Sequence, residues 1–207
     1  KKRRNGPVVI VVSDITRPVP YKLFLPQLLD YLISEGVRKE EITILVATGM
    51  HRASTMDEKL FMFGEDIAIN YRIIDHDAEN EAGLVSIKGT SWSGSEVKLN
   101  RYYTEAGFRI LTGLVEPHFM AGFSGGRKAV CPGLVSLDTI RMFHGYGFLS
   151  HPNASNGILE DNPLHLEACS IAGLCPSDFS INIVLDQNKQ INSIISGEQF
   201  KSHEEAV

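Results

Sequence analysis

The chain has 207 residues, of which 43% are hydrophobic and 22% are charged, a composition typical of a folded globular protein. A net charge of −5 and a pI near 5.8 argue against nucleic acid as the main partner, because nucleic acid binds to basic protein surfaces. The basic run Lys1–Arg4 is predicted to be a solvated leader, and the apolar stretch Val8–Val12 is too short to span a membrane. We therefore expect one cytoplasmic domain.

Short apolar runs rich in β-branched residues recur along the chain, and most of them lack the alternation of a half-exposed strand. Such runs are typical of strands buried on both faces of a parallel sheet. They cover residues 8–12, 42–47, 71–74 and 108–111. Helical patterns lie between them, including leucines at helical spacing that precede Gly36 and a T-x-x-E capping box at Thr55.

Two further pairs of runs are separated by turn-forming residues. Residues 84–87 and 96–99 predict a small antiparallel excursion, and residues 179–185 and 190–195 predict a hairpin. The sequence as a whole predicts an α/β fold, a Rossmann-like three-layer sandwich with a mainly parallel sheet and a small antiparallel excursion. The three cysteines include no C-x-x-C pair, and we expect them to be free thiols, with Cys131 buried.

Polar side chains follow the first two predicted strands directly. Asp14, Thr16 and Arg17 come after the first strand, and His51 follows the second. Because ligands of open α/β sheets bind at the carboxyl ends of strands, these residues are candidates for a site. The alternatives are that Asp14 or Thr16 caps the next helix, that Arg17 pairs with a surface acid, and that His51 is solvated.

The stretch Glu116–Lys128 reads E-P-H-F-M-A-G-F-S-G-G-R-K, which is too polar for a core strand and too rich in glycine for an ordinary helix. Gly125 and Gly126 permit close approach of backbone N–H groups to an anion, and Arg127 and Lys128 add positive charge. A phosphate-bearing ligand is therefore predicted. The P-loop pattern does not match, which argues against an NTPase.

Three histidines and one lysine suit several chemistries. Two of His51, His118 and His144 can act as opposed general acid and base, and the third can bind a metal such as nickel or zinc. His144 can alternatively stabilise a helix end. Lys128 beside phosphate-binding glycines can carry a covalent cofactor, as in pyridoxal phosphate enzymes. A binding module without catalysis is equally consistent with the spacing, which leaves these alternatives open.

The motifs D-I-T-R-P at 14–18, T-G-M-H-R at 48–52 and the stretch 116–128, followed by His144, occur in this order along the chain. Together they resemble the lactate racemase family that uses a nickel-pincer nucleotide cofactor. The resemblance covers most of the chain and implies that residues 1–207 form the N-terminal, catalytic and cofactor-binding domain, with the family's C-terminal domain absent.

The resemblance also implies residue roles. Lys128 would join the nucleotide covalently, and His144 would be the protein ligand to nickel. His51 and His118 would be the catalytic histidines, and Arg17 would bind the substrate. Further contacts to the cofactor are expected from Asp14, Thr16, Gly125 and Gly126.

The implied reaction is racemisation or epimerisation of a small 2-hydroxy acid by hydride transfer to and from the cofactor. Cofactor-maturation proteins and the missing C-terminal domain are the expected partners, without nucleic acid or membrane. The alternatives are a Schiff-base enzyme that uses Lys128 and a phosphate- or nucleotide-binding module.

Overall fold

A computed structural model describes residues 6–207, so the predicted leader Lys1–Arg4 lies outside the described residues. Within residues 6–207 the main sheet has six strands in the order β10-β9-β6-β1-β2-β3. Neighbouring strands are parallel except β10, which pairs antiparallel with β9. The strands are β1 (Val8–Ser13), β2 (Ile42–Ala47), β3 (Arg72–Asp75), β6 (Phe108–Leu114), β9 (Phe179–Leu185) and β10 (Ile191–Gly197).

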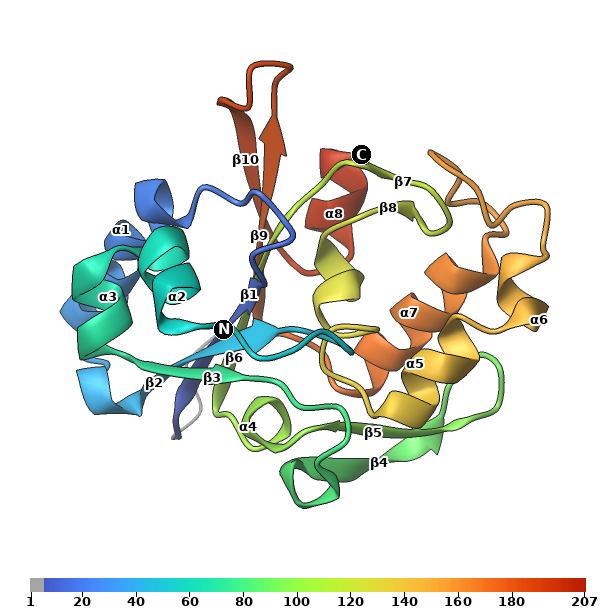
Figure 1. Ribbon diagram of the computed structural model, residues 1–207, viewed down its shortest axis with the longest axis horizontal. Coiled ribbons are helices and arrows are strands. Elements are labelled where there is room, and N and C mark those ends of the chain that lie inside the picture. Colours follow the sequence, from blue (N-terminus) through green and yellow to red (C-terminus); the bar gives the residue numbers. More distant parts are fainter. Residues whose placement is uncertain (1–5) are drawn as a thin grey trace.

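Helices cover both faces of the sheet, as Figure 1 shows. One face carries α1 (Tyr21–Ser34), α2 (Met56–Phe63) and α3 (Glu65–Asn70). The other carries α4 (Arg101–Thr104), α5 (Leu137–Phe143), α6 (Tyr146–Leu149) and α7 (Pro163–Leu174). The chain ends in α8 (Lys201–Ala206), and short 3₁₀ turns form η1 (Lys39–Glu41) and η2 (Glu81–Gly83).

Strand β1 explains why the sheet is buried on both sides. Val9 and Val11 point into the core beneath α5 and α7, whereas Ile10 and Val12 point into the core beneath α1 and α2. Successive side chains of a strand face opposite ways, so a continuous apolar run fills two cores at once. The predicted three-layer α/β sandwich with a mainly parallel sheet is confirmed.

The predicted antiparallel excursion is also confirmed, as β4 (Leu84–Thr90) paired with β5 (Glu96–Asn100). The glycine-rich stretch has more regular structure than predicted. It forms a small hairpin of β7 (Pro117–His118) and β8 (Gly122–Phe123), followed by the 3₁₀ turn η3 (Gly126–Ala129).

Two local expectations need correction. In α1 the buried face includes Phe24, Leu25 and Leu29, but Leu23 is 60% exposed, so the apolar stripe of the helix is narrower than the leucine pattern indicates. The polar segment D-H-D at residues 75–77 indicates a site residue or a solvated turn residue at His76, but the structure buries this side chain. Its ring bonds the Val135 carbonyl and the Asn100 amide.

The cysteines agree with the sequence: all three are free, and Cys131 is fully buried. Across residues 6–207, no helix combines the length and the apolar character that crossing a bilayer requires.

Candidate active site

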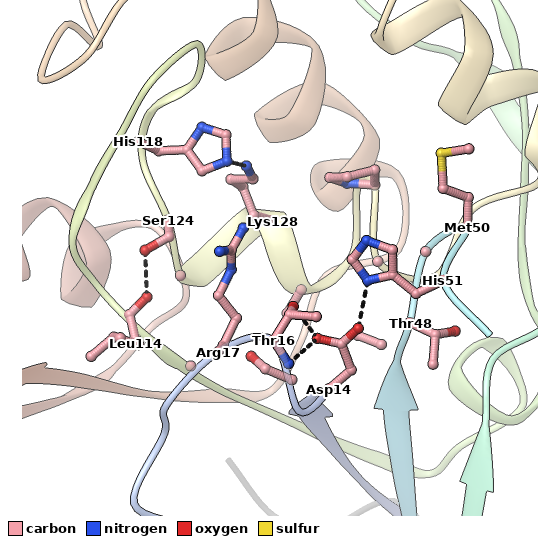
Figure 2. A pocket seen from close by; sticks show the side chains of 18 of the residues that line it. Asp14, Thr16, Arg17, Thr48, Met50, His51, Leu114, His118, Ser124 and Lys128 are labelled. Atoms are coloured by element: carbon pink, nitrogen blue, oxygen red, sulfur yellow. Dashed lines mark hydrogen bonds and ion pairs between the residues drawn. The ribbon is translucent and has the colours of Figure 1, made fainter. Parts of the chain in front are cut away.

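A cavity of about 270 Å³ lies at the carboxyl ends of β1, β2 and β6. The chain connects β1 to β2 on one side and reaches β6 on the other, so this is the point at which strand order reverses and where open α/β sheets bind ligands. Eight of the nine predicted site residues line the cavity: Asp14, Thr16, Arg17, His51, His118, Gly125, Lys128 and His144. Figure 2 shows side chains from several loops converging there.

Asp14 and His51 form a pair across two neighbouring loops. Asp14 Oδ2 lies 2.6 Å from His51 Nδ1, and Asp14 Oδ1 accepts hydrogen bonds from the Thr16 backbone N–H at 3.1 Å and from the Thr16 hydroxyl at 2.5 Å. The carboxylate can only accept, so His51 carries a proton on Nδ1 and, when neutral, exposes the lone pair of Nε2. Figure 2 shows both contacts.

His118 and Lys128 form a second pair on the opposite side of the cavity. His118 Nε2 lies 2.8 Å from Lys128 Nζ. The His118 Nδ1 atom faces the backbone N–H groups of Met120 and Ala121, at 3.4 and 3.3 Å. Because Nδ1 accepts these bonds, we assign the proton of the neutral ring to Nε2, from which it is donated to Lys128.

The charges around this second pair favour neutral forms. Burial, with the nearby charges of Lys128 and Arg17, lowers the pKa of His118 to about 3. Burial lowers the pKa of Lys128 to about 7, and the guanidinium groups of Arg127 and Arg17 contribute to the shift. A lysine with a free amine near neutral pH is a nucleophile rather than a simple anion-binding charge.

His144 lies at the C-terminal end of α5 and is half-buried. Its Nδ1 donates to the Ile140 carbonyl at 2.9 Å, which leaves Nε2 with a free lone pair. Metal-binding histidines characteristically donate their second nitrogen in this way, because the bond fixes both tautomer and ring orientation. His144 therefore has the features of a metal ligand, and its helix-end position also permits the stabilising role.

Arg17 is half-buried and lines the cavity from the loop after β1. No acidic side chain among residues 6–207 forms an ion pair with its guanidinium. The predicted alternative, a pair with a surface acid, is therefore wrong for the described chain. A planar cation without a partner suits a carboxylate or phosphate ligand.

The glycines adopt conformations that disfavour larger residues. Gly125 has φ of +75°, and a Cβ there would lie 2.6 Å from Val115 Cγ2. Gly126 has φ of +49°, and a Cβ there would lie 2.7 Å from the His203 ring. Gly126 thus packs away from the cavity and does not line it, and its role toward a cofactor stays a prediction.

Arg127 requires a clear correction, because the sequence predicted an anion-binding charge beside Lys128. Its side chain is only 1% exposed and does not line the cavity. The guanidinium donates to the Ala121 carbonyl at 2.9 Å and lies 2.8 Å from His203 Nε2. Arg127 therefore links the glycine-rich stretch to His203 on the side away from the cavity. Its side chain affects Lys128 only through its charge.

Two apolar residues at the cavity were not predicted. Phe119 is 75% exposed and stacks on the His118 ring at 4.7 Å, and Met50 is 64% exposed. Each is adjacent in sequence to a predicted catalytic histidine, and that position is the signal that points to them. Exposed apolar side chains beside a cavity are typical of a site that binds a ligand or another protein surface.

The comparisons with known proteins agree with this geometry. The sequence pattern described as the lactate racemase N-terminal domain matches residues 2–157, which include every predicted site residue. The chain belongs to the lactate racemase N-terminal domain family.

Two relatives of this family are lactate racemases. The one from Thermoanaerobacterium thermosaccharolyticum is 38% identical over 95% of this chain and 46% of the relative. The one from Lactiplantibacillus plantarum is 40% identical over 95% of this chain and 46% of the relative. The chain therefore spans about half the length of the curated relatives it matches.

Solved structures show the same fold. The lactate racemase apoprotein from Thermoanaerobacterium thermosaccharolyticum superposes with a TM-score of 0.93 at 37% identity, covering 97% of this chain and 48% of the other. A Thermotoga maritima protein superposes with a TM-score of 0.83 at 22% identity, covering 97% and 53%, which shows the fold alone. The predicted membership of the lactate racemase family is confirmed.

Proposed function

We propose that this chain forms the cofactor-binding and catalytic half of a 2-hydroxy acid racemase or epimerase that uses a covalently attached nickel-pincer nucleotide. The observation that carries the proposal is the convergence of Lys128, His118, His51, His144 and Arg17 on one cavity at the switch point of the sheet. Family membership supports the same reading, since both curated relatives are lactate racemases.

The residues of the cavity fit such a cofactor. Lys128 offers a free amine for an amide-type bond, and His144 offers a lone pair on Nε2 for nickel. Among residues 6–207 no group of three histidine, cysteine, aspartate or glutamate side chains is placed to hold a metal ion by itself. One protein histidine is enough when the other donor atoms belong to the cofactor, as in a pincer ligand.

The chemistry that the nucleotide supplies when bound is reversible acceptance of hydride from the α-carbon of the substrate. The protein supplies proton transfer and orientation. His51 Nε2, with its lone pair held outward by Asp14, is placed to accept the hydroxyl proton of the substrate. His118 carries its proton on Nε2 and is placed to donate, so the two histidines begin in complementary states.

In the proposed site, Arg17 binds the substrate carboxylate. Its planar guanidinium binds both carboxylate oxygens at once, which a lysine cannot do. Holding the carboxylate fixes the α-carbon relative to both histidines. Met50 and Phe119 at the mouth keep water away from a planar keto intermediate.

The test is to produce the chain together with cofactor-maturation proteins and to measure nickel, intact mass and the modified peptide. We expect one nucleotide adduct on Lys128 with bound nickel. Racemisation of several 2-hydroxy acids is then followed by chiral chromatography, with this chain and with a form extended through a second domain. An adduct on another lysine, or full activity without any adduct, contradicts the proposal.

A further inference from the structure

Lys128 presents a reactive amine to the cavity before any cofactor is attached. His118 Nδ1 accepts from two backbone N–H groups, so the proton on Nε2 points to Lys128 Nζ at 2.8 Å. An ammonium has no lone pair and cannot accept that bond. The hydrogen-bond pattern therefore requires the free amine.

Burial and the nearby charges support this protonation state. Burial and the guanidinium charges of Arg127 and Arg17 lower the pKa of Lys128, whereas Cys131 acts in the opposite direction with a smaller effect. In residues 6–207 no carboxylate forms an ion pair with Nζ. Lys59 differs, because its Nζ forms an ion pair with Asp75 Oδ2 at 2.6 Å.

Arg17 supplies the second element of a small-molecule site. Its guanidinium lines the same cavity of about 270 Å³ and has no acidic partner in the described chain. Figure 2 shows its side chain extending toward Lys128. A carboxylate bound at Arg17 would bring a neighbouring carbonyl carbon to the amine, as in a 2-oxo acid, whose ketone is adjacent to its carboxylate.

We propose that the cofactor-free cavity has a second activity, in which Lys128 condenses reversibly with small 2-oxo acids while Arg17 holds their carboxylate. The Nζ lone pair leaves its hydrogen bond with His118 and attacks the carbonyl carbon, so the new C–N bond forms as the C=O π bond breaks and its electron pair moves to the oxygen. The former carbonyl oxygen takes the proton of His118 Nε2, and the nitrogen returns its extra proton to His118. The resulting carbinolamine loses water and becomes an imine, so no oxidant or reductant is needed.

This activity follows from the unloaded site and does not depend on the racemase reaction. It has a consequence for the proposed function, because an imine occupies the atom to which the nucleotide would be joined. A 2-oxo acid would then compete with cofactor loading. Hydrolysis of the imine would restore the free lysine.

The test uses the 207-residue chain produced without cofactor-maturation proteins. The protein is incubated with pyruvate and sodium cyanoborohydride, which converts an imine into a stable secondary amine, and is analysed by intact mass and peptide mapping. We expect a single saturable adduct on Lys128. The methyl ester of pyruvate, which lacks the carboxylate, should label Lys128 about tenfold more slowly, because the charge-assisted bonds to Arg17 are lost.

Three variants sharpen this test. Lys128→Arg should abolish the adduct, and Arg17→Gln should remove the difference between pyruvate and its ester. Lys59→Arg is the matched control and should leave labelling of Lys128 unchanged, since Lys59 is paired with Asp75. The comparison of acid with ester in the unmodified protein needs no variant, so it stands even where a substitution prevents folding.

Two results would overturn the inference: labelling spread over surface lysines with Lys128 unmodified, and equal labelling of Lys128 by acid and ester. The result is separable from that of the racemase proposal. A protein that forms the imine but takes no nucleotide on Lys128 contradicts only the proposed function. A protein that takes the nucleotide but forms no imine contradicts only this inference.

Discussion

The cavity holds two pairs of side chains, each built on a histidine, and their surroundings differ in charge and burial. In the first pair, the His51 side chain is 56% exposed and Nδ1 contacts the Asp14 carboxylate. In the second pair, His118 is 7% exposed and contacts the Lys128 amine, with Arg17 and Arg127 nearby. We call these the His51 pair and the Lys128 pair.

Because of these surroundings, the two histidines have different hydrogen-bonding roles. A carboxylate holds the His51 proton on Nδ1 and turns a lone pair toward the cavity, whereas backbone N–H groups on Nδ1 of His118 turn its proton toward the cavity. The partner of Nδ1 thus decides whether Nε2 of each histidine accepts or donates a hydrogen bond.

The largest effect is expected from breaking the Lys128 pair with Lys128→Ala. This change removes the proposed attachment atom, so we expect loss of the nucleotide adduct, of bound nickel and of all racemisation. Intact mass and metal analysis of protein matured with its cofactor provide the measurement. Lys59→Ala serves as a control that retains the adduct, and retention of nickel by Lys128→Ala would contradict the prediction.

His51→Gln and His118→Gln should each lower turnover by about 10²–10⁴-fold, the usual contribution of a general acid or base. Nickel and the adduct should remain in both variants, which separates proton transfer from metal binding. The two variants should differ in one respect when they are produced without cofactor: only His118→Gln should change the reactivity of the Lys128 amine toward an amine-modifying reagent. Equal Lys128 reactivity in the two variants would show that the pairs are not distinct.

Asp14→Asn should weaken the His51 pair alone. The amide no longer fixes the proton on Nδ1, so the ring loses its orientation, and we expect turnover to fall about 10²-fold. The pH dependence of Lys128 modification should stay unchanged, because Asp14 contacts His51 and Thr16 rather than Lys128. Unchanged turnover would mean that the carboxylate does not orient the base.

A smaller effect is expected on the free energy of unfolding in acid. It comes from His203, which is buried beside the Arg127 guanidinium. Burial and the Arg127 charge lower the pKa of His203 to about 4, and its Nε2 lies 2.8 Å from the guanidinium. The native state therefore binds fewer protons than the unfolded chain between about pH 4 and 6.5, so stability is lost as pH falls through that window. The loss from this histidine is up to about 3 kcal/mol.

The measurement is denaturant unfolding at several pH values with the unmodified chain and with His203→Gln. The variant should show a shallower fall in unfolding free energy between pH 6.5 and 4, whatever its stability at neutral pH. Parallel curves for the two proteins would contradict the assignment. His51→Gln is a suitable comparison, because its exposed ring lies outside the buried cationic region.

Much of the site was predictable because its residues occupy standard positions in an α/β fold. Asp14, Arg17 and His51 follow buried strands directly, and parallel strands bring their carboxyl ends to one edge. The long glycine-rich motif with Lys128 then pointed to a single family. Local sequence is sufficient here, because strand formation and loop position depend on neighbouring residues.

The surroundings of individual side chains were harder to predict from the sequence. His76 lies in a polar D-H-D segment, yet it is buried against Val135 and Asn100. Arg127 lies beside Lys128 in the motif, yet it points the other way and contacts His203, 76 residues further along the chain. Neither outcome has a local signal, because the partners are distant in sequence.

Apolar periodicity and an extended motif are properties of consecutive residues, so the fold class, the family and the candidate site residues could be inferred from the sequence alone. The folded chain was needed to show which nitrogen of each histidine faces the cavity, that Arg127 is buried and that burial lowers the pKa of Lys128. These properties depend on hydrogen-bond partners and burial, which exist only once distant segments pack together.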